Sequence, residues 1–300
     1  MTPSLRLAPL MLSVALVGCV NLTPTYERAV PPVPETLPVT ESAAATVAVI
    51  GWEDLVESED LAGLITLALE NNRDLRAATA RIALAEAQYG ITRAARLPSV
   101  SASGSVTETG TFDGDSASAL LMDSARAQLG VTAYELDLFG RVASLNEAAL
   151  QTYLSTVEGE RSVKISLISS VAQAWLTLAA DQERLRLAKE TVESQGASLS
   201  LTRELFDSGV VTEIDVRRAS ASVETAKAQV AQFTGLVRQD LNALRFVVGA
   251  DVPADIAGKA VLSPSPLMDR LAVGASSDIL LSRPDVLAAE RQLRAANANI

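Results

Sequence analysis

Side chains suited to catalysis form no recognisable pattern in this sequence. It contains no histidine, so the usual general base and the commonest metal ligand are both missing. None of its carboxylates, lysines or serines falls into a recognisable catalytic motif. The formal charge of −11 argues against nucleic-acid binding, which needs a basic stripe. The sequence therefore predicts a protein that is not an enzyme and that carries neither a metal nor a cofactor.

The single cysteine, Cys19, is the residue whose surroundings predict a covalent reaction. It follows an apolar leader, residues 1–18, that ends in Leu16-Val17-Gly18 and resembles a bacterial lipobox. There, small residues precede the cleavage site and the thiol accepts a diacylglycerol. The alternative is a plain signal peptide with a coincidental cysteine. We expect lipidation of Cys19, and export to the outer membrane because no aspartate follows the cysteine.

Residues 19–60 form a segment rich in proline, threonine, valine and alanine. This composition is typical of extended, polyproline-like chain rather than of helix. The arm is either a disordered linker behind the lipid or a strap along the outside of a larger body, and the sequence leaves both open.

The first helical pattern follows Asp60, which is a plausible N-cap. Apolar residues then recur at three- and four-residue spacing, and Pro98 ends the pattern, so a helix is predicted over 61–96. Its apolar stripe consists of Leu61, Leu64, Ile65, Ala68, Leu69, Leu75, Ala78, Ile82, Ala85 and Tyr89.

Between 99 and 137 the apolar period changes to two. Alternating segments at 100–106 and 125–133 flank a turn-rich loop at 110–115. The pattern predicts a β-hairpin with arms of about ten residues, which is also the length of a tilted strand that crosses a bilayer. Because alanine and glycine make a weak apolar face, the pattern alone leaves a soluble hairpin open.

Very long helices dominate the rest of the chain. One is predicted over 139–207, which lacks proline, and it would be about 100 Å long. Gly209 is a predicted left-handed cap, and another helix is predicted over 212–248. Ordinary globular helices are far shorter, so the longest helix must be a coiled coil, a spacer or part of a barrel wall.

An internal repeat is indicated because residues 284–289 echo residues 73–78. On this interpretation 61–266 is one structural repeat, and 271–300 begins a second copy that the chain leaves incomplete. The whole protein would then have roughly 470 residues. Chance similarity between two alanine-rich helices is the alternative.

The order of helix, hairpin, very long helix, tight turn and shorter helix resembles the TolC-type outer-membrane factors. Two stretches resemble their lipoprotein branch, the OprM/NodT-like subunits of RND tripartite efflux pumps: residues 134–141, where the second strand leads into the long helix, and residues 280–286. The strand-to-helix motif consists of Glu135, Asp137, Phe139, Gly140 and Arg141.

The resemblance implies a mainly α-helical fold with a membrane β-hairpin. Very long antiparallel helices would form part of a trimeric α-barrel, and the hairpin would supply strands of a 12-stranded transmembrane β-barrel. Four strands per protomer cannot close a barrel, whereas three protomers supply twelve. The implied location is the outer membrane, lipid-anchored and extending into the periplasm.

The implied function is that of an exit duct that passively conducts drugs or other small toxic compounds. Its partners would be two further copies, outer-membrane lipid, a periplasmic adaptor and an inner-membrane RND-type pump. The turn after the long helix resembles the family's periplasmic tip, where adaptors dock. The expected docking residues are Phe206, Gly209, Val210, Val211, Thr212 and Glu213.

Two other classes of protein carry long helical hairpins. A periplasmic adaptor would place β domains on both sides of its hairpin, and a structural coiled-coil lipoprotein would lack the segments with a period of two. Within the efflux family, the sequence does not separate drug export from metal export. The residues that gate the duct would lie mainly in the second repeat, so none is assigned.

Overall fold

The computed structural model describes residues 24–28, 30, 51–111, 120–135, 137–262, 267 and 277–299. The expected leader, Cys19, most of the arm, the hairpin loop at 112–119 and residues 271–276 lie outside the described residues.

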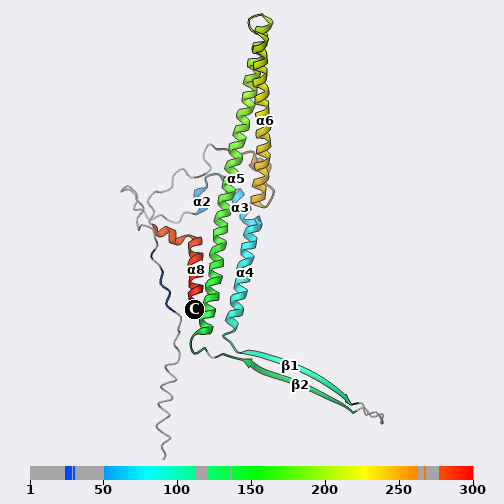
Figure 1. Ribbon diagram of the computed structural model, residues 1–300, viewed down its shortest axis with the longest axis vertical. Helices are drawn as coiled ribbons and strands as arrows, with labels where there is room; N and C mark the ends of the chain where they lie inside the picture. Colours follow the sequence, from blue (N-terminus) through cyan, green and yellow to red (C-terminus); the bar gives the residue numbers. More distant parts are fainter. Residues whose placement is uncertain are drawn as a thin grey trace, which may run out of the picture. The chain divides into compact units, whose positions relative to one another are not determined.

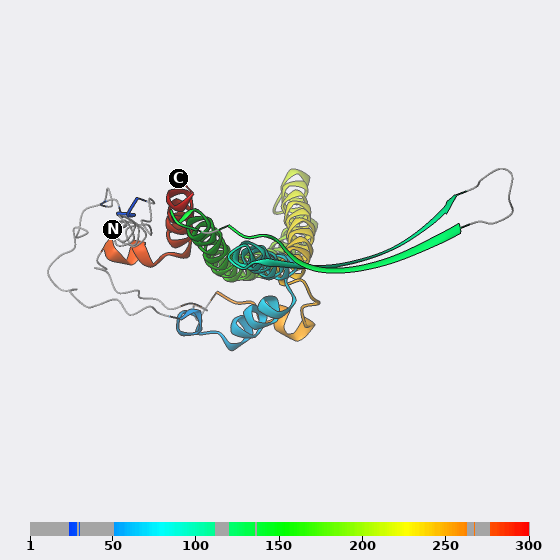
Figure 2. The same ribbon diagram turned by 90° about the horizontal axis from the view of Figure 1, so that it is seen from below.

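The described part of the chain is mostly helical and contains one β-hairpin, which confirms the expected fold class (Figures 1 and 2). Its elements are α2 (Trp52–Leu55), α3 (Glu59–Asn71), α4 (Arg73–Ala94), β1 (Ser99–Thr111), β2 (Leu120–Ala133), α5 (Arg141–Asp207), α6 (Glu213–Val248), α7 (Ala254–Ala257), the 3₁₀ helix η2 (Ser277–Ser282) and α8 (Pro284–Ala298).

The chain divides into two compact units. The hairpin unit consists of Met1–Val30, Ile82–Val157 and Leu287–Ile300. The core unit consists of Pro31–Arg81 and Glu158–Val286.

The single helix expected over 61–96 is wrong, because the chain breaks at Asn72 into α3 and α4. The backbone N–H of Asn72 donates to the Ala68 carbonyl at 2.8 Å and closes α3. Its side-chain oxygen accepts the Leu75 N–H at 2.9 Å and caps α4. Its side-chain NH₂ donates to the Val247 carbonyl at 2.7 Å, near the end of α6. One buried residue therefore satisfies the backbone groups of three helix ends.

The start of α3 also differs from the expectation. Its N-cap is Ser58 rather than Asp60, and the Ser58 hydroxyl accepts the Leu61 N–H at 3.3 Å. Asp60 lies in the first turn and pairs with Lys259 at 3.4 Å. An acidic residue in a first turn is also stabilised by the helix dipole, which explains why the sequence pattern suits either assignment.

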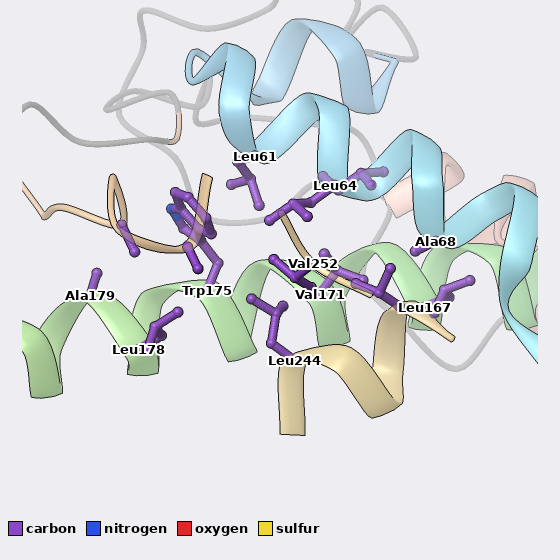
Figure 3. Packing of buried hydrophobic residues seen from close by; sticks show 14 of the residues in the cluster. Leu61, Leu64, Ala68, Leu167, Val171, Trp175, Leu178, Ala179, Leu244 and Val252 are labelled. Atoms are coloured by element: carbon purple, nitrogen blue, oxygen red, sulfur yellow. The ribbon is translucent and has the colours of Figure 1, made fainter. Parts of the chain in front are cut away.

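The apolar core of the core unit lies where α3, α5 and the end of α6 meet (Figure 3). Trp175 and Val171 project from α5 toward Leu64 of α3, and Leu244 enters from α6. Each fully buried side chain of this size contributes about 1.5–3 kcal/mol through burial. The largest fully buried side chains are Trp175, Leu61, Leu64, Ile65, Leu178, Leu244, Val171 and Val248.

Helix α5 has 67 residues and is therefore about 100 Å long. It is joined to the antiparallel α6 by a tight turn (Figure 1). Among the described helices, α5 is long and apolar enough to cross a membrane. A crossing needs only about 20 residues, however, so a spacer or a wall accounts better for its length.

Strands β1 and β2 pair antiparallel, with Val100 opposite Val131 and Ser105 opposite Arg126. They contain 13 and 14 residues, more than the ten expected. Paired residues share a face of the hairpin, so the register sorts the side chains into two sets. The apolar face carries Val100, Ala102, Gly104, Val106, Ala125, Ala127, Leu129 and Val131. The polar face carries Ser101, Ser103, Ser105, Thr107, Ser124, Arg126, Gln128 and Gly130.

Within the hairpin unit, α8 lies beside the first part of α5 (Figures 1 and 2). The Ser155 hydroxyl donates to the Ala288 carbonyl at 3.0 Å. On another side of α5, the rings of Tyr89 and Tyr153 stack with centroids 6.3 Å apart. Both α4 and α8 are thus held against the same stretch of α5.

Candidate functional site

The strand-to-helix motif forms a tight junction between β2 and α5. The Asp137 carboxylate accepts the backbone N–H of Ala143 at 2.8 Å and so caps α5. Gly140 has φ 79°, a left-handed conformation that strains any residue with a side chain. Arg141 donates from Nε to Glu135 at 2.9 Å and from a second nitrogen to the other carboxylate oxygen. The motif's polar residues therefore fix the path of the chain between strand and helix.

Charge and apolar exposure coexist at this junction. The hydrogen bonds from Arg141 hold the pKa of Glu135 below its ordinary value, so the pair stays ionised at neutral pH. Phe139 is 66% exposed, and Tyr134 and Leu138 are exposed beside it. Exposed aromatic rings next to a strand are typical of the girdle where a barrel strand leaves a bilayer.

The turn between α5 and α6 is closed by a glycine cap, as predicted. Gly209 has φ 77°, and its N–H donates to the Phe206 carbonyl at 2.8 Å. The Val210 N–H donates to the Leu205 carbonyl at 2.9 Å. These bonds satisfy carbonyl groups at the end of α5 that the helix itself leaves free.

Polar groups at the start of α6 also have hydrogen-bond partners. The backbone N–H and the hydroxyl of Thr212 donate to the Asp215 carboxylate at 3.0 and 2.6 Å. Glu213 pairs with Arg217 at 2.8 Å along the first turn of α6. The hydrogen bonds from Thr212 hold the pKa of Asp215 below its ordinary value. The turn thus keeps its shape through its own hydrogen bonds.

Apolar side chains remain exposed around this turn. Val210 is 69% exposed and Phe206 is also exposed, whereas Val211 is half-buried. Ile214 is 63% exposed and was missed by the sequence analysis, although an isoleucine between two acidic residues was a usable signal. We name Phe206, Val210, Val211 and Ile214 the tip patch. Such a patch on a rigid turn suits contact with another protein.

Part of the N-terminal arm makes defined contacts that the sequence could not reveal. Residues 24–28, here named the strap, meet one stripe of α8 with every second residue. The Asn297 amide donates to the Pro24 carbonyl at 2.8 Å, and the Arg294 guanidinium lies 5.1 Å from the centre of the Tyr26 ring. These contacts favour, for residues 24–28, the alternative of a strap along a larger body over that of a disordered linker.

The third strap contact is an ion pair between Arg28 and Glu290. The Glu290 side chain is only 11% exposed, and Arg294 also donates to it, at 2.8 Å. The hydrogen bond from Arg28, then that from Arg294, hold the pKa of Glu290 below its ordinary value. Without the strap, this carboxylate would lose one of its two cationic partners.

A hollow of about 750 Å³ lies beside Asn72 in the core unit. Its charged lining residues are Arg73, Asp74, Arg245 and Asp251. Two serines, Ser166 and Ser170, also line it, whereas no lysine, cysteine or histidine does. Among the described residues, no group of three or more Asp, Glu or Cys side chains is placed to hold a metal ion.

Comparison with known proteins places these features in context. Residues 64–250 match a family model described as outer membrane efflux protein. TtgC, a probable efflux pump outer membrane protein of Pseudomonas putida, is 40% identical over 305 aligned positions, which cover 98% of this chain and 62% of that protein.

Two solved structures extend the comparison. A membrane protein from Pseudomonas aeruginosa superposes with a TM-score of 0.78 at 34% identity, covering 93% of this chain and 63% of that one. The open state of the MtrE outer membrane channel of Neisseria gonorrhoeae gives a TM-score of 0.78 at 32% identity, covering 93% and 62%. The chain thus spans less than two thirds of the length of these relatives.

Proposed function

The chain belongs to the outer membrane efflux protein family, and from this premise we propose that it supplies part of the wall of a trimeric, passively conducting exit duct. Membership confirms the resemblance to TolC-type channels and the expectation that the protein is not an enzyme. The wider activity, the partners and the cargo are proposals for this chain.

The observation that carries the proposal is the register of the hairpin. Over 100–107 and 124–131, the strands place their alternating apolar residues on one face and their polar residues on the other. A barrel strand needs this arrangement, because one face meets lipid and the other meets a water-filled lumen. In a monomer the apolar face is open to solvent, with Leu129 79% exposed and Val106 74% exposed.

Among the described residues, the outer edges of the two-stranded hairpin pair with no other strand, and this supports oligomerisation. Edge backbone groups left unpaired in lipid would each cost several kcal/mol, so the strands must pair with others. We propose that three protomers, each with two hairpins from two repeats, close a 12-stranded barrel. Helix α5 would then continue the wall into the periplasm for about 100 Å.

Cysteine accessibility tests the hairpin's placement. In the full-length protein in outer membranes, Ser103→Cys and Gln128→Cys should react with a charged, membrane-impermeant thiol reagent. Ala102→Cys and Leu129→Cys, one position away on each strand, should be protected by lipid. The unsubstituted protein gives the background from Cys19. Equal labelling of both faces would contradict a lipid-facing hairpin.

We further propose that Cys19 carries the lipid anchor, supported by the Leu16-Val17-Gly18 sequence before it. Mass spectrometry of the membrane-extracted protein should find cleavage after Gly18 and acyl chains on Cys19. Cys19→Ser should leave the leader uncleaved by the lipoprotein peptidase. A mature protein with an unmodified Cys19 would overturn the anchor.

The tip patch is proposed as the docking surface for a periplasmic adaptor, through which an inner-membrane RND-type pump would deliver cargo. The patch is apolar, exposed and carried by a self-supporting turn. If β2 leads out of the outer membrane into α5, the turn at Gly209 lies about 100 Å farther along that helix. It would then face the inner membrane.

Export assays test this docking surface. Val210→Asp in the full-length protein should abolish pump-dependent export and adaptor cross-linking, because a buried charge in an apolar contact is costly. Trimer formation and lipidation should persist. Val261→Asp, at an exposed valine outside the patch, is the matched control and should export normally. Normal export by the Val210 variant would reject the docking surface.

A further inference from the structure

The polar face of the hairpin carries a single charged side chain among its described residues. Arg126 stands opposite Ser105, and its neighbours on the same face are Ser103, Ser124 and Gln128. All of these neighbours are uncharged, and no described residue forms an ion pair with Arg126. Beyond the end of β2, Glu135 and Arg141 pair with each other.

The sign of this charge is unexpected for the chain as a whole. Acidic residues number 36 against 25 lysines and arginines. A lumen that merely followed the average composition would carry negative charge and favour cations. The polar face instead presents hydroxyls, one amide and one guanidinium.

We propose that Arg126 sets the charge preference of the outer-membrane section of the duct. This inference rests on the proposed function, because it needs the polar face to line a lumen. Threefold symmetry would then place three Arg126 guanidinium groups in one ring. Rings of like charge in a pore raise the local concentration of the opposite ion. The ring makes this section favour small anions over cations of equal size.

The size of the effect depends on salt in a predictable way. Three charges about 10 Å from the axis are weakly screened at 0.01 M salt, where the Debye length is about 30 Å. They are almost fully screened at 1 M, where it is about 3 Å. Removing them should lower the chloride-to-potassium permeability ratio about twentyfold at 0.01 M and about fivefold at 0.1 M, with almost no change at 1 M, because the ring enriches the anion and depletes the cation by the same factor.

Reversal potentials in planar bilayers measure this ratio. The full-length wild-type protein and its Arg126→Gln variant would be compared under a threefold KCl gradient at each mean salt concentration. Arg126→Lys keeps the charge and should retain the wild-type ratio. Gln128→Glu adds one negative charge per protomer to the same face and should lower the ratio even if Arg126→Gln assembles poorly. Trimer bands on unheated gels establish assembly for each variant.

The outcomes separate this inference from the proposal beneath it. A drop in the ratio for Arg126→Gln that disappears at 1 M salt, with Arg126→Lys unchanged, supports the ring. If the trimers conduct and their chloride-to-potassium permeability ratio is the same with and without Arg126, the proposed role of Arg126 is wrong, but the proposed duct still holds. A wild-type protein that inserts without conducting overturns the duct, and the ring with it.

Discussion

The core and the far half of the α5–α6 pair are built from the same two helices, yet they pack very differently. In the core, α3 adds a third layer, and Trp175, Leu178 and Leu244 are at most 1% exposed. We name residues 185–235 the distal pair. There no third helix of the described chain covers the seam, and the described buried apolar residues are only Ala188, Leu199, Val223 and Ala226.

The distal pair also leaves apolar side chains in solvent, with Leu187 48% and Leu201 58% exposed. Two isolated helices with small buried residues gain little from burial. The difference indicates that the core stabilises each protomer, whereas the distal pair depends on neighbouring helices in an assembly. Three pairs of substitutions and one single substitution can break or sharpen this comparison.

The largest expected difference is between two identical truncations. Leu244→Ala removes a leucine that is 0% exposed and should cost about 3–5 kcal/mol, because it leaves a cavity in the core. Leu199→Ala removes one that is 8% exposed and should cost about 1–2 kcal/mol, since the thin seam can close around it. Guanidinium unfolding of the solubilised protein measures both, and equal losses would break the comparison.

Two glycines with the same backbone conformation provide the next test. Gly209 and Gly249 both have φ 77°. A Cβ at Gly249 would lie 2.8 Å from the Asn71 carbonyl oxygen, whereas one at Gly209 meets nothing within 4 Å. Gly249→Ala should therefore cost about 2–4 kcal/mol, from strain plus the clash.

Gly209→Ala, carrying the strain alone, should cost about 1 kcal/mol. The same unfolding measurement separates the two variants. If Gly209→Ala proves as damaging as Gly249→Ala, the turn contributes more to stability than its exposure indicates.

A smaller effect on stability is expected from substitutions where the core meets the distal pair. Burial, and then the neighbouring Asp181 carboxylate, raise the pKa of Asp240, while Arg184 partly offsets this. Ionised Asp240 therefore costs stability, and the cost appears as pH rises through its raised folded pKa. Asp240→Asn should raise the unfolding midpoint at pH 7 and have no effect in acid, below the ordinary aspartate range. Asp181→Asn should stabilise less, because it also removes the partner of Arg184.

The smallest effect is expected at the tip. The folded pKa of Asp215 is lowered, so its capping contribution is complete above the ordinary aspartate pKa and is lost as pH falls through the lower folded value. Asp215→Asn should speed amide exchange in the first turn of α6 at neutral pH and leave the global midpoint unchanged. A shift of the midpoint would show that the tip is coupled to the core.

Features that depend on a few adjacent residues could be predicted from the sequence. The cap at Gly209 and the Thr212 turn are made by neighbours within a few positions. The ion pair between Glu135 and Arg141 was not predicted, although it is nearly as local and spans only six residues. The hairpin faces follow from alternation, which the register then brings together across the two strands.

Features that depend on distant partners could not be predicted. The break at Asn72 interrupts a good helical pattern, and its partner Val247 lies 175 residues away. The contact between Arg28 and Glu290 joins residues 262 positions apart. In both cases the local pattern fits several structures, and the side chain that decides between them comes from elsewhere in the chain.

The contact residues of the strap and those of α8 are spaced unequally along their two segments. Extended chain advances about 6.6 Å for every two residues. The stripe of α8 from Glu290 to Asn297 advances about 10 Å over its three contacts, against about 13 Å for the strap. Across this length the two sets of contact residues therefore shift relative to each other by about half of one contact spacing. A strap of five residues is therefore close to the longest that such matching permits, and one inserted residue between Pro24 and Arg28 would turn Tyr26 away from Arg294.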